Sequence, residues 1–215
     1  MNNDSRLYLI TPPQLPDLRA FCDDFTAALD AGDVACIQLR LKAGDGSAVT
    51  DDDVLYAAEA IMPIAQEREV AFIINDRPDL ALKTGADGVH VGQSDASCKK
   101  ARAVLGDDAT VGVTCHESKH FALVAGEDGA DYVAFGAFFP TTTKETEFKA
   151  EIGLLEWWSY ATTLPSVAIG GITPENCRPI VRAGADFLAV SGAVWNHPEG
   201  PGAAIKAFEM SISEA

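Results

Sequence analysis

Apolar residues recur along this chain in eight short runs, with segments of helical patterning between them. Within each run the apolar residues are continuous rather than alternating with polar ones, which is typical of parallel strands covered on both faces. We therefore predict that strand and helix alternate throughout. The predicted strands are residues 7–10, 35–39, 71–74, 88–91, 111–113, 132–135, 167–169 and 187–190. The predicted helices are residues 17–31, 51–69, 78–84, 96–105, 117–126, 151–163, 174–183 and 201–211.

A Gly-Ala-Asp triplet begins at Gly85, Gly129 and Gly184, and Gly32 starts a similar turn. Each copy closes a helical segment and opens a strand, as expected where a glycine ends a helix in the left-handed conformation. The spacings of 53, 44 and 55 residues each correspond to two strand–helix units. Four double units predict a closed (β/α)8 barrel, a TIM barrel, in one domain spanning residues 1–215.

A doubly wound open sheet is the alternative α/β architecture. It would need a glycine-rich dinucleotide turn after the first strand, where this chain has Thr11-Pro12-Pro13. The barrel is therefore the preferred prediction.

Composition narrows the class of protein. The formal charge of −16, from 32 acidic and 16 basic residues, argues against a nucleic-acid partner. No apolar run approaches the roughly 18 to 20 residues of a membrane span. Five scattered cysteines, with no Cys-x-x-Cys pair, suggest neither a disulfide framework nor a zinc site. We expect a cytoplasmic protein that is not tied to a membrane and that captures any anionic ligand locally.

Polar residues that follow the strands are the informative ones, because the active site of such a barrel lies at the carboxyl ends of its strands. Strand periodicity puts Gln38, Arg40 and Lys42 on one side, facing inward if the intervening leucines face the helices. An inward Arg–Lys pair without an adjacent acid indicates an anion site. The alternative is a strand edge that frays into solvent.

Two carboxylates and an amide follow the next two strands. Asn75 and Asp76 end the third, and Asp95 follows the fourth. Neighbouring strands are about 4.8 Å apart, so one cation can be shared, and oxygen ligands of this kind suit Mg²⁺. Either aspartate could instead cap the following helix.

A second anion site is predicted near the end of the barrel. Residues 136–144, Gly-Ala-Phe-Phe-Pro-Thr-Thr-Thr-Lys, run from a strand into three hydroxyls and an ammonium that can bind phosphate oxygens. Gly170-Gly171 and Ser191-Gly192 end the last two strands, where barrels often bind phosphate. A solvated threonine-rich turn is the alternative for the first of these segments.

Two histidines follow or lie within strands. His116 invites a general acid–base role, yet no serine or cysteine nucleophile with an oxyanion site accompanies it, and Cys115 beside it suits a small buried side chain. His90 lies within an apolar run and is expected to be an interior histidine with satisfied hydrogen bonds.

These residues together make the chain resemble the thiamine phosphate synthase family over nearly its whole length. The matching pieces are Gln38-Leu39-Arg40-x-Lys42, Asn75-Asp76-Arg77, Gly88-Val89-His90-x-Gly92-Gln93-x-Asp95, Gly136 with Thr141-x-Thr143-Lys144, Ile169-Gly170-Gly171-Ile172 and Val190-Ser191. The resemblance implies a barrel enzyme that transfers the hydroxymethylpyrimidine group from its pyrophosphate to thiazole phosphate, with Mg²⁺ as cofactor and pyrophosphate as leaving group.

The resemblance also implies residue roles. Asp76 and Asp95 would hold Mg²⁺, and Arg40, Lys42 and Lys144 would stabilise the leaving group, which makes them the catalytic candidates. The pyrophosphate would lie against Gln38, Arg40, Lys42, Asn75 and Lys144, and the thiazole phosphate against Thr141, Thr143, Gly171, Val190 and Ser191.

The chain departs from the family pattern at two of these positions. Leu41 stands where an acidic residue is usual, and Thr114 where serine is usual, so we expect the Thr114 hydroxyl still to reach the pyrimidine or the pyrophosphate. The alternatives are a thiazole tautomerase-like relative, which would use a histidine near His116, and a non-catalytic barrel that binds a phosphate ligand. The implied partners are the two small-molecule substrates, with a possible homo-oligomer.

Overall fold

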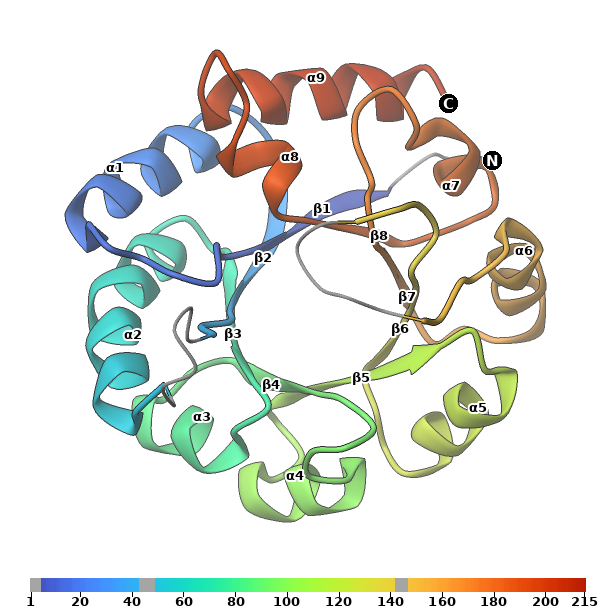
Figure 1. Cartoon of the computed structure of the whole chain (residues 1–215). Helices are drawn as coiled ribbons and strands as arrows, with labels where there is room; N and C mark the ends of the chain where they lie inside the picture. Colours follow the sequence, from blue (N-terminus) through green and yellow to red (C-terminus); the bar gives the residue numbers. More distant parts are fainter. Residues whose placement is uncertain (1–4, 43–48, 142–146) are drawn as a thin grey trace.

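The computed structural model describes residues 5–42, 49–141 and 147–215. Eight parallel strands close into a barrel in which each strand pairs with its sequence neighbours and β1 pairs with β8. Figure 1 shows the strands as a central ring with the helices outside it. The predicted (β/α)8 barrel is confirmed. The strands are β1 (Arg6–Ile10), β2 (Val34–Leu39), β3 (Ala71–Asn75), β4 (Gly88–Val91), β5 (Thr110–His116), β6 (Tyr132–Gly136), β7 (Ser166–Ile169) and β8 (Phe187–Val190).

Four of the helices in the described ranges, α1, α2, α4 and α5, begin at a polar side chain that accepts from the free backbone N–H groups of the first turn. Thr50 and Asp53 form a reciprocal capping box, and Ser97 and Ser118 each accept from the residue three positions on. The helices of the described ranges are α1 (Leu18–Leu29), α2 (Asp51–Gln66), α3 (Pro78–Thr84), α4 (Cys98–Leu105), α5 (Lys119–Glu127), α6 (Ile152–Ala161), α7 (Arg178–Arg182), α8 (Gly192–Trp195) and α9 (Pro201–Ser213).

Two features of the helices differ from the sequence prediction. The helix predicted at residues 174–183 is regular only over α7, because Thr173 and Asn176 form a turn before it. The Asn176 side-chain oxygen accepts from the Thr173 N–H at 2.8 Å, and the Asn176 N–H donates to the Thr173 carbonyl. The four-residue α8 lies outside the predicted helices, since one turn is too short to show a helical period.

The aspartates of the Gly-Ala-Asp triplets explain why that triplet recurs. Asp87, Asp131 and Asp186 each accept, at 2.7 Å, from a backbone N–H near the start of the preceding strand. Each also donates its own N–H to the carbonyl of that same residue. The triplet therefore joins strands in pairs at the amino-terminal end of the barrel. Asp33 of the fourth copy differs, because its carboxylate binds Arg6.

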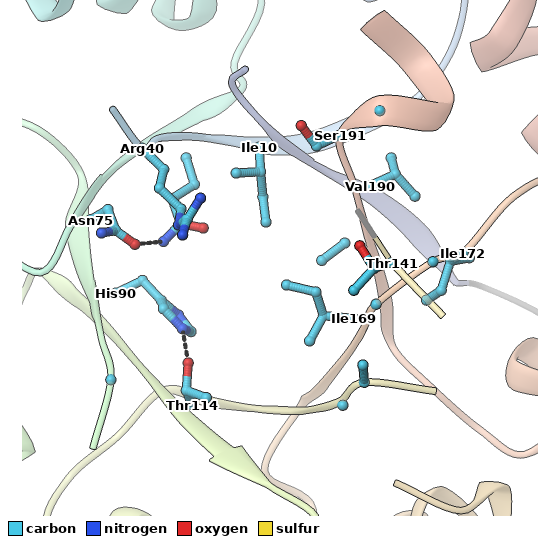
Figure 2. Close-up of a pocket in the computed structure, with 18 of the residues that line it drawn as sticks. Ile10, Arg40, Asn75, His90, Thr114, Thr141, Ile169, Ile172, Val190 and Ser191 are labelled. Carbon is cyan, nitrogen blue, oxygen red and sulfur yellow. Dashed lines mark hydrogen bonds between the residues drawn. The ribbon is translucent and has the colours of Figure 1, made fainter. Parts of the chain in front are cut away.

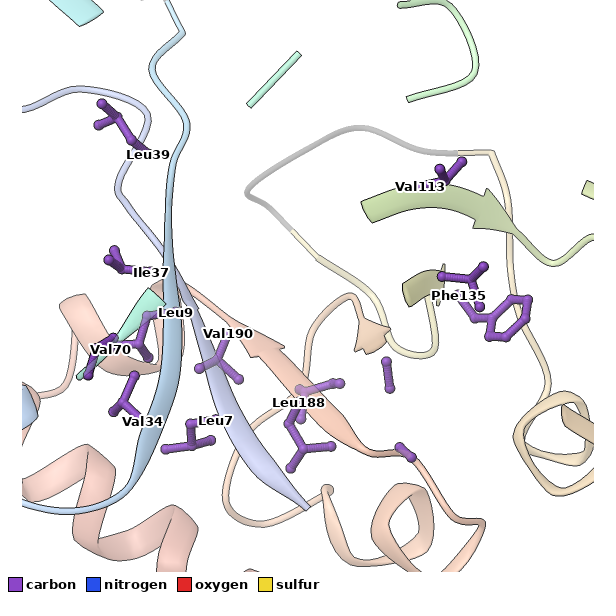
Figure 3. Close-up of a cluster of buried hydrophobic side chains, with 14 of the residues drawn as sticks. Leu7, Leu9, Val34, Ile37, Leu39, Val70, Val113, Phe135, Leu188 and Val190 are labelled. Atoms are coloured by element: carbon purple, nitrogen blue, oxygen red, sulfur yellow. The ribbon is translucent and has the colours of Figure 1, made fainter. Parts of the chain in front are cut away.

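Two hydrophobic clusters hold the barrel. The larger one lies between the strands and the helices, and Figure 3 shows part of it, including Leu7, Ile37 and Leu188. The smaller one fills the barrel interior below the pocket and includes Tyr8, Ile73 and Tyr132. Strand positions therefore alternate between the two clusters, as the two-residue period of a strand requires.

No helix in the ranges that the structure describes is both long and apolar enough to cross a membrane.

Candidate active site

A cavity of about 700 Å³ opens at the carboxyl ends of the barrel strands. This is the end at which (β/α)8 barrels carry their active sites, and the volume is typical of a small-molecule site. Figure 2 shows a polar side formed by the ends of β2 to β4 and the loop after β2, an opposite side formed by the end of β8 and the loops after β6 to β8, and isoleucines between them. The β2–β4 side carries Arg40, Asn75 and His90, the β6–β8 side Thr141, Val190 and Ser191, with Ile10 and Ile169 in the middle.

The β2–β4 side presents a cation that has no counter-ion within the described part of the chain. No carboxylate there lies within ion-pair distance of the Arg40 guanidinium, and burial lowers the pKa of Arg40, an effect that the charge of Asp76 partly offsets. The buried Gln38 amide donates to the Asn75 side-chain oxygen at 2.9 Å, so the Asn75 amide nitrogen remains as a donor on a residue that lines the pocket. This side is therefore suited to an anion.

Lys42 corrects one expectation about this side. It lines the pocket with Arg40 as predicted, but its ammonium lies 3.3 Å from an Asp76 carboxylate oxygen. Asp76 comes from the next strand end, so the pair could not be seen as neighbours in the sequence. Lys42 therefore already has a counter-ion, whereas Arg40 has none within the described ranges, which makes Arg40 the better anion ligand of the two.

Asp76 and Asp95 lie together, as the sequence predicted. Burial and then the neighbouring Asp76 carboxyl raise the pKa of Asp95. Asp76 adopts a left-handed backbone conformation with φ of 63°, which is uncommon outside glycine and is often found at functional sites. Neither aspartate caps a helix, because Arg77 and Ser97 stand at the cap positions of α3 and α4. The alternative role predicted for them is thus excluded.

The carboxylate pair fits a Mg²⁺ ion better than a metal held by protein alone. Within the described ranges, no group of three or more His, Cys, Asp or Glu side chains is arranged to hold a metal ion. Mg²⁺ usually takes one or two carboxylates and completes its octahedron with water and substrate phosphates. Two adjacent carboxylates on the anion-binding side match that donor set, since a cation would relieve their mutual repulsion.

The β6–β8 side is built from closely packed loops. Gly171 lines the pocket with φ of 62°, and a Cβ there would lie 2.2 Å from the Pro140 carbonyl oxygen. The glycine is therefore needed so that the loop before Thr141 can pack on the loop after β7. Asn176 holds the same loop by donating to the Gly171 carbonyl at 2.9 Å. Asn176 was missed in the sequence, where nothing distinguishes it from other surface amides.

Three predicted residues of this side are placed as follows. Thr141 and Ser191 line the pocket, and the Ser191 hydroxyl donates to the Thr11 carbonyl at 3.4 Å. The Val190 side chain is buried in the cluster between strands and helices, so only its backbone can serve a ligand. Thr142, Thr143 and Lys144 lie outside the described residues.

The two histidines face the pocket in different ways. His90 is an interior histidine with satisfied hydrogen bonds, as predicted: its Nδ1 lies 2.9 Å from the Tyr132 hydroxyl and its Nε2 2.8 Å from the Thr114 hydroxyl. The His116 ring stacks on Phe148, with centroids 3.9 Å apart. Tyr132 was not predicted as a site residue, because a tyrosine at the start of an apolar run is expected to be an ordinary buried core residue.

Comparison with known proteins gives consistent matches. The model of the thiamine monophosphate synthase family matches residues 7–194. The thiamine-phosphate synthase of Rhodospirillum centenum (strain ATCC 51521 / SW) is 59% identical over 205 residues, covering 95% of this chain and 96% of the relative. That of Hyphomonas neptunium (strain ATCC 15444) is 56% identical, covering 95% and 92%. The solved structure of thiamine phosphate pyrophosphorylase from Pyrococcus furiosus superposes with a TM-score of 0.83 at 28% identity, covering 99% of this chain and 97% of the other.

Proposed function

This chain belongs to the thiamine monophosphate synthase family, and we propose how its pocket performs the reaction of that family. The chain is an enzyme, a transferase that moves the hydroxymethylpyrimidine group from its pyrophosphate to thiazole phosphate. Thiamine phosphate and pyrophosphate are the products. The pocket must therefore hold two anionic groups and bring two rings together between them.

The observation that carries the proposal is the division of the pocket into two polar sides separated by apolar side chains (Figure 2). We assign the pyrophosphate to the β2–β4 side, where Arg40, Asn75 and Lys42 can donate to its oxygens. We assign the thiazole phosphate to the β6–β8 side, near Gly171 and Ser191. The two rings then meet over the isoleucines.

We propose Mg²⁺ as the cofactor, held by Asp76 and Asp95 together with the pyrophosphate oxygens. When bound, it supplies positive charge to the leaving group. The closeness of the two carboxylates supports this assignment, since burial and then the Asp76 charge raise the pKa of Asp95. Lys42, paired with Asp76, would keep that carboxylate directed towards the same place.

The chemistry then follows from charge. The bond between the pyrimidine methylene carbon and the pyrophosphate oxygen breaks, and the thiazole nitrogen forms a new bond to that carbon. Negative charge grows on the departing oxygen, where the Arg40 guanidinium and the Asn75 amide are held in place before the reaction begins. Each such preorganised donor is worth roughly 3 kcal/mol in comparable sites. No covalent nucleophile is required.

The roles proposed for Thr143 and Lys144 rest on the resemblance alone. Lys144 would add a second cation to the leaving group, and Thr143 would join Thr141 at the thiazole phosphate. Thr114, which lines the pocket between the two sides, would contact the pyrimidine pyrophosphate.

The test is an assay of the purified chain with both substrates and Mg²⁺. We expect thiamine phosphate and pyrophosphate in equal amounts. Rearrangement of thiazole phosphate without the pyrimidine substrate would identify a tautomerase instead. Binding of either phosphate without turnover would identify a non-catalytic barrel.

We also propose the cytoplasm as the place where the chain works. Its five cysteines are all unpaired, and four of them are buried, which suits a reducing compartment. The possible homo-oligomer stays a prediction, which sedimentation equilibrium would measure directly.

A further inference from the structure

Four side chains form a continuous line of hydrogen bonds from the barrel interior to the pocket. The Tyr8 and Tyr132 hydroxyls lie 2.9 Å apart, and the Tyr132 hydroxyl lies 2.9 Å from His90 Nδ1. His90 Nε2 lies 2.8 Å from the Thr114 hydroxyl, the contact drawn in Figure 2. Tyr8 and Tyr132 are buried in the interior cluster, whereas His90 and Thr114 line the pocket. The line therefore ends at the substrate.

A missing side chain on β5 makes the line possible. His90 on β4 and Tyr132 on β6 both pair with Gly112 on the strand between them. A Cβ at Gly112 would lie 1.9 Å from the Tyr132 ring. The glycine thus leaves space in which the His90 imidazole and the Tyr132 phenol meet across the intervening strand β5. The contact therefore depends on a glycine at position 112.

The direction of the line follows from counting donors and acceptors. A neutral imidazole donates from one ring nitrogen and accepts at the other. If Nδ1 donated to Tyr132, three N–H and O–H donors would share two contacts, so one of the two tyrosine O–H groups would be left without an acceptor. Among the residues that the structure describes, the Tyr8 hydroxyl has no hydrogen-bond partner except Tyr132. A doubly protonated imidazole would leave the same buried donor unsatisfied, which is costly.

The opposite direction leaves nothing over. Tyr8 donates to Tyr132, Tyr132 donates to Nδ1, Nε2 donates to the Thr114 oxygen, and the Thr114 O–H points on to the ligand. Burial raises the pKa of both tyrosines well above the ordinary value, so both keep their protons for this arrangement. Hydrogen bonds that all run one way also strengthen one another.

We propose that Tyr8 and Tyr132 fix His90 as its Nε2–H tautomer and thereby make the Thr114 hydroxyl a hydrogen-bond donor to the pyrimidine pyrophosphate. The ligand atom that faces the Thr114 hydroxyl must therefore be a hydrogen-bond acceptor, either a pyrimidine ring nitrogen or a pyrophosphate oxygen. A donor such as an amino group would not fit there. His90 and Tyr132 are positioning residues that act through Thr114. The identity of the ligand in this inference rests on the proposed function, whereas the tautomer of His90 rests on the hydrogen-bond geometry alone.

The tautomer is measured without substrate by proton–nitrogen NMR of the ¹⁵N-labelled wild-type chain. The chain has four histidines, and the signals of His90 are identified by their loss in His90→Gln. We expect a neutral ring with the proton on Nε2 near pH 7. A proton on Nδ1, or on both nitrogens, overturns the proposal whatever the enzyme catalyses.

The action through Thr114 is measured by a double-mutant cycle in kcat. Thr114→Val removes the hydroxyl, and we expect a loss of about 10- to 100-fold, the range for one hydrogen bond to a charged group. Tyr132→Phe should lower kcat roughly threefold to tenfold in the wild-type chain. It removes the hydrogen bond that orients His90, so the Thr114 hydroxyl is held less firmly as a donor. In the Thr114→Val background the same change should cost nothing further. Equal losses in both backgrounds overturn the proposal.

Controls separate positioning from packing. Thr114→Ser keeps the hydroxyl and should retain most of the wild-type kcat that Thr114→Val loses. Ile73→Val, in the same interior cluster as Tyr132, should lower thermal stability without changing kcat. Inhibition by inorganic pyrophosphate shows which substrate atom accepts from Thr114. If Thr114→Val weakens this inhibition, the acceptor is a pyrophosphate oxygen. If the inhibition is unchanged, the acceptor is the pyrimidine ring nitrogen. An inactive wild-type chain would refute the proposed function and leave the NMR result standing.

Discussion

Replacing Arg40 with methionine should lower activity while leaving the fold as stable as before, or more so. The Arg40 guanidinium is partly buried, and no carboxylate in the described ranges pairs with it. Methionine keeps most of the length and apolar contact of the side chain, and its introduction leaves no counter-ion unpaired. Single stabilising substitutions commonly gain about 0.5 to 2 kcal/mol, and they cost function where activity needs a destabilised site.

The activity loss follows from the bonds that Arg40 can make to the leaving group. Two charge-assisted hydrogen bonds are worth about 1.5 to 3 kcal/mol each. Losing them should cost roughly 3 to 6 kcal/mol of transition-state stabilisation, which is on the order of 10² to 10⁴ in kcat/KM for the pyrimidine substrate. Arg40→Lys keeps the charge but loses the planar fork, so it should recover only part of the rate.

Arg102 provides the matched control, because it is a partly buried arginine at the other end of the barrel. Its guanidinium donates to the Gly129 carbonyl and to the Asp131 carboxylate, at 2.8 and 2.6 Å. Arg102→Met should cost about 2 kcal/mol or more of unfolding free energy and leave kcat unchanged. Pyrophosphate release measures kcat/KM, and calorimetry measures stability. A large stability loss in Arg40→Met, or unchanged kcat/KM, would refute the assignment of Arg40.

Three further predictions concern the metal, the second lysine and the rival acid–base residue. Asp76→Asn and Asp95→Asn should give folded chains that need far more Mg²⁺ for half-maximal rate, and an unchanged Mg²⁺ titration in both would contradict the metal site. Lys144→Ala should lower kcat by roughly 10² to 10³ with a smaller change in KM, because its charge acts mainly on the leaving group. A rise in KM alone would mean that Lys144 only holds the substrate. His116→Ala should lose less than about tenfold in kcat, since no base is needed there, and a loss of a thousandfold would favour the tautomerase chemistry.

The barrel and its strand ends could be predicted because their signals are local in the sequence. Continuous apolar runs and the Gly-Ala-Asp triplet mark the strands and the turns that lead into them. Once the strands were ordered, Arg40, Asp76 and Asp95 had to lie at one end of the barrel. Strand period places Arg40 on the inner side, and the order of neighbouring strand ends places Asp76 beside Asp95.

The rest could not be predicted because it depends on contacts between distant strands. The Lys42–Asp76 pair, the line from Tyr8 to Thr114, and the packing of Gly171 on Pro140 all join residues of different strands or of the loops that follow them. Their partners are set by barrel closure and register, which no short window of sequence records. Tyr132 illustrates the limit, since its burial was expected from the apolar run, whereas its contact with His90 depends on Gly112 of the strand between them.

The most direct test of the two-sided pocket is a crystal structure of the chain with Mg²⁺, pyrophosphate and thiazole phosphate. We predict the pyrophosphate against Arg40 and Asn75, with the metal between it and the carboxylates of Asp76 and Asp95. The thiazole phosphate should lie at the opposite side, near Gly171 and Ser191. Pyrophosphate bound on the β6–β8 side, or both anions on one side, would contradict the account.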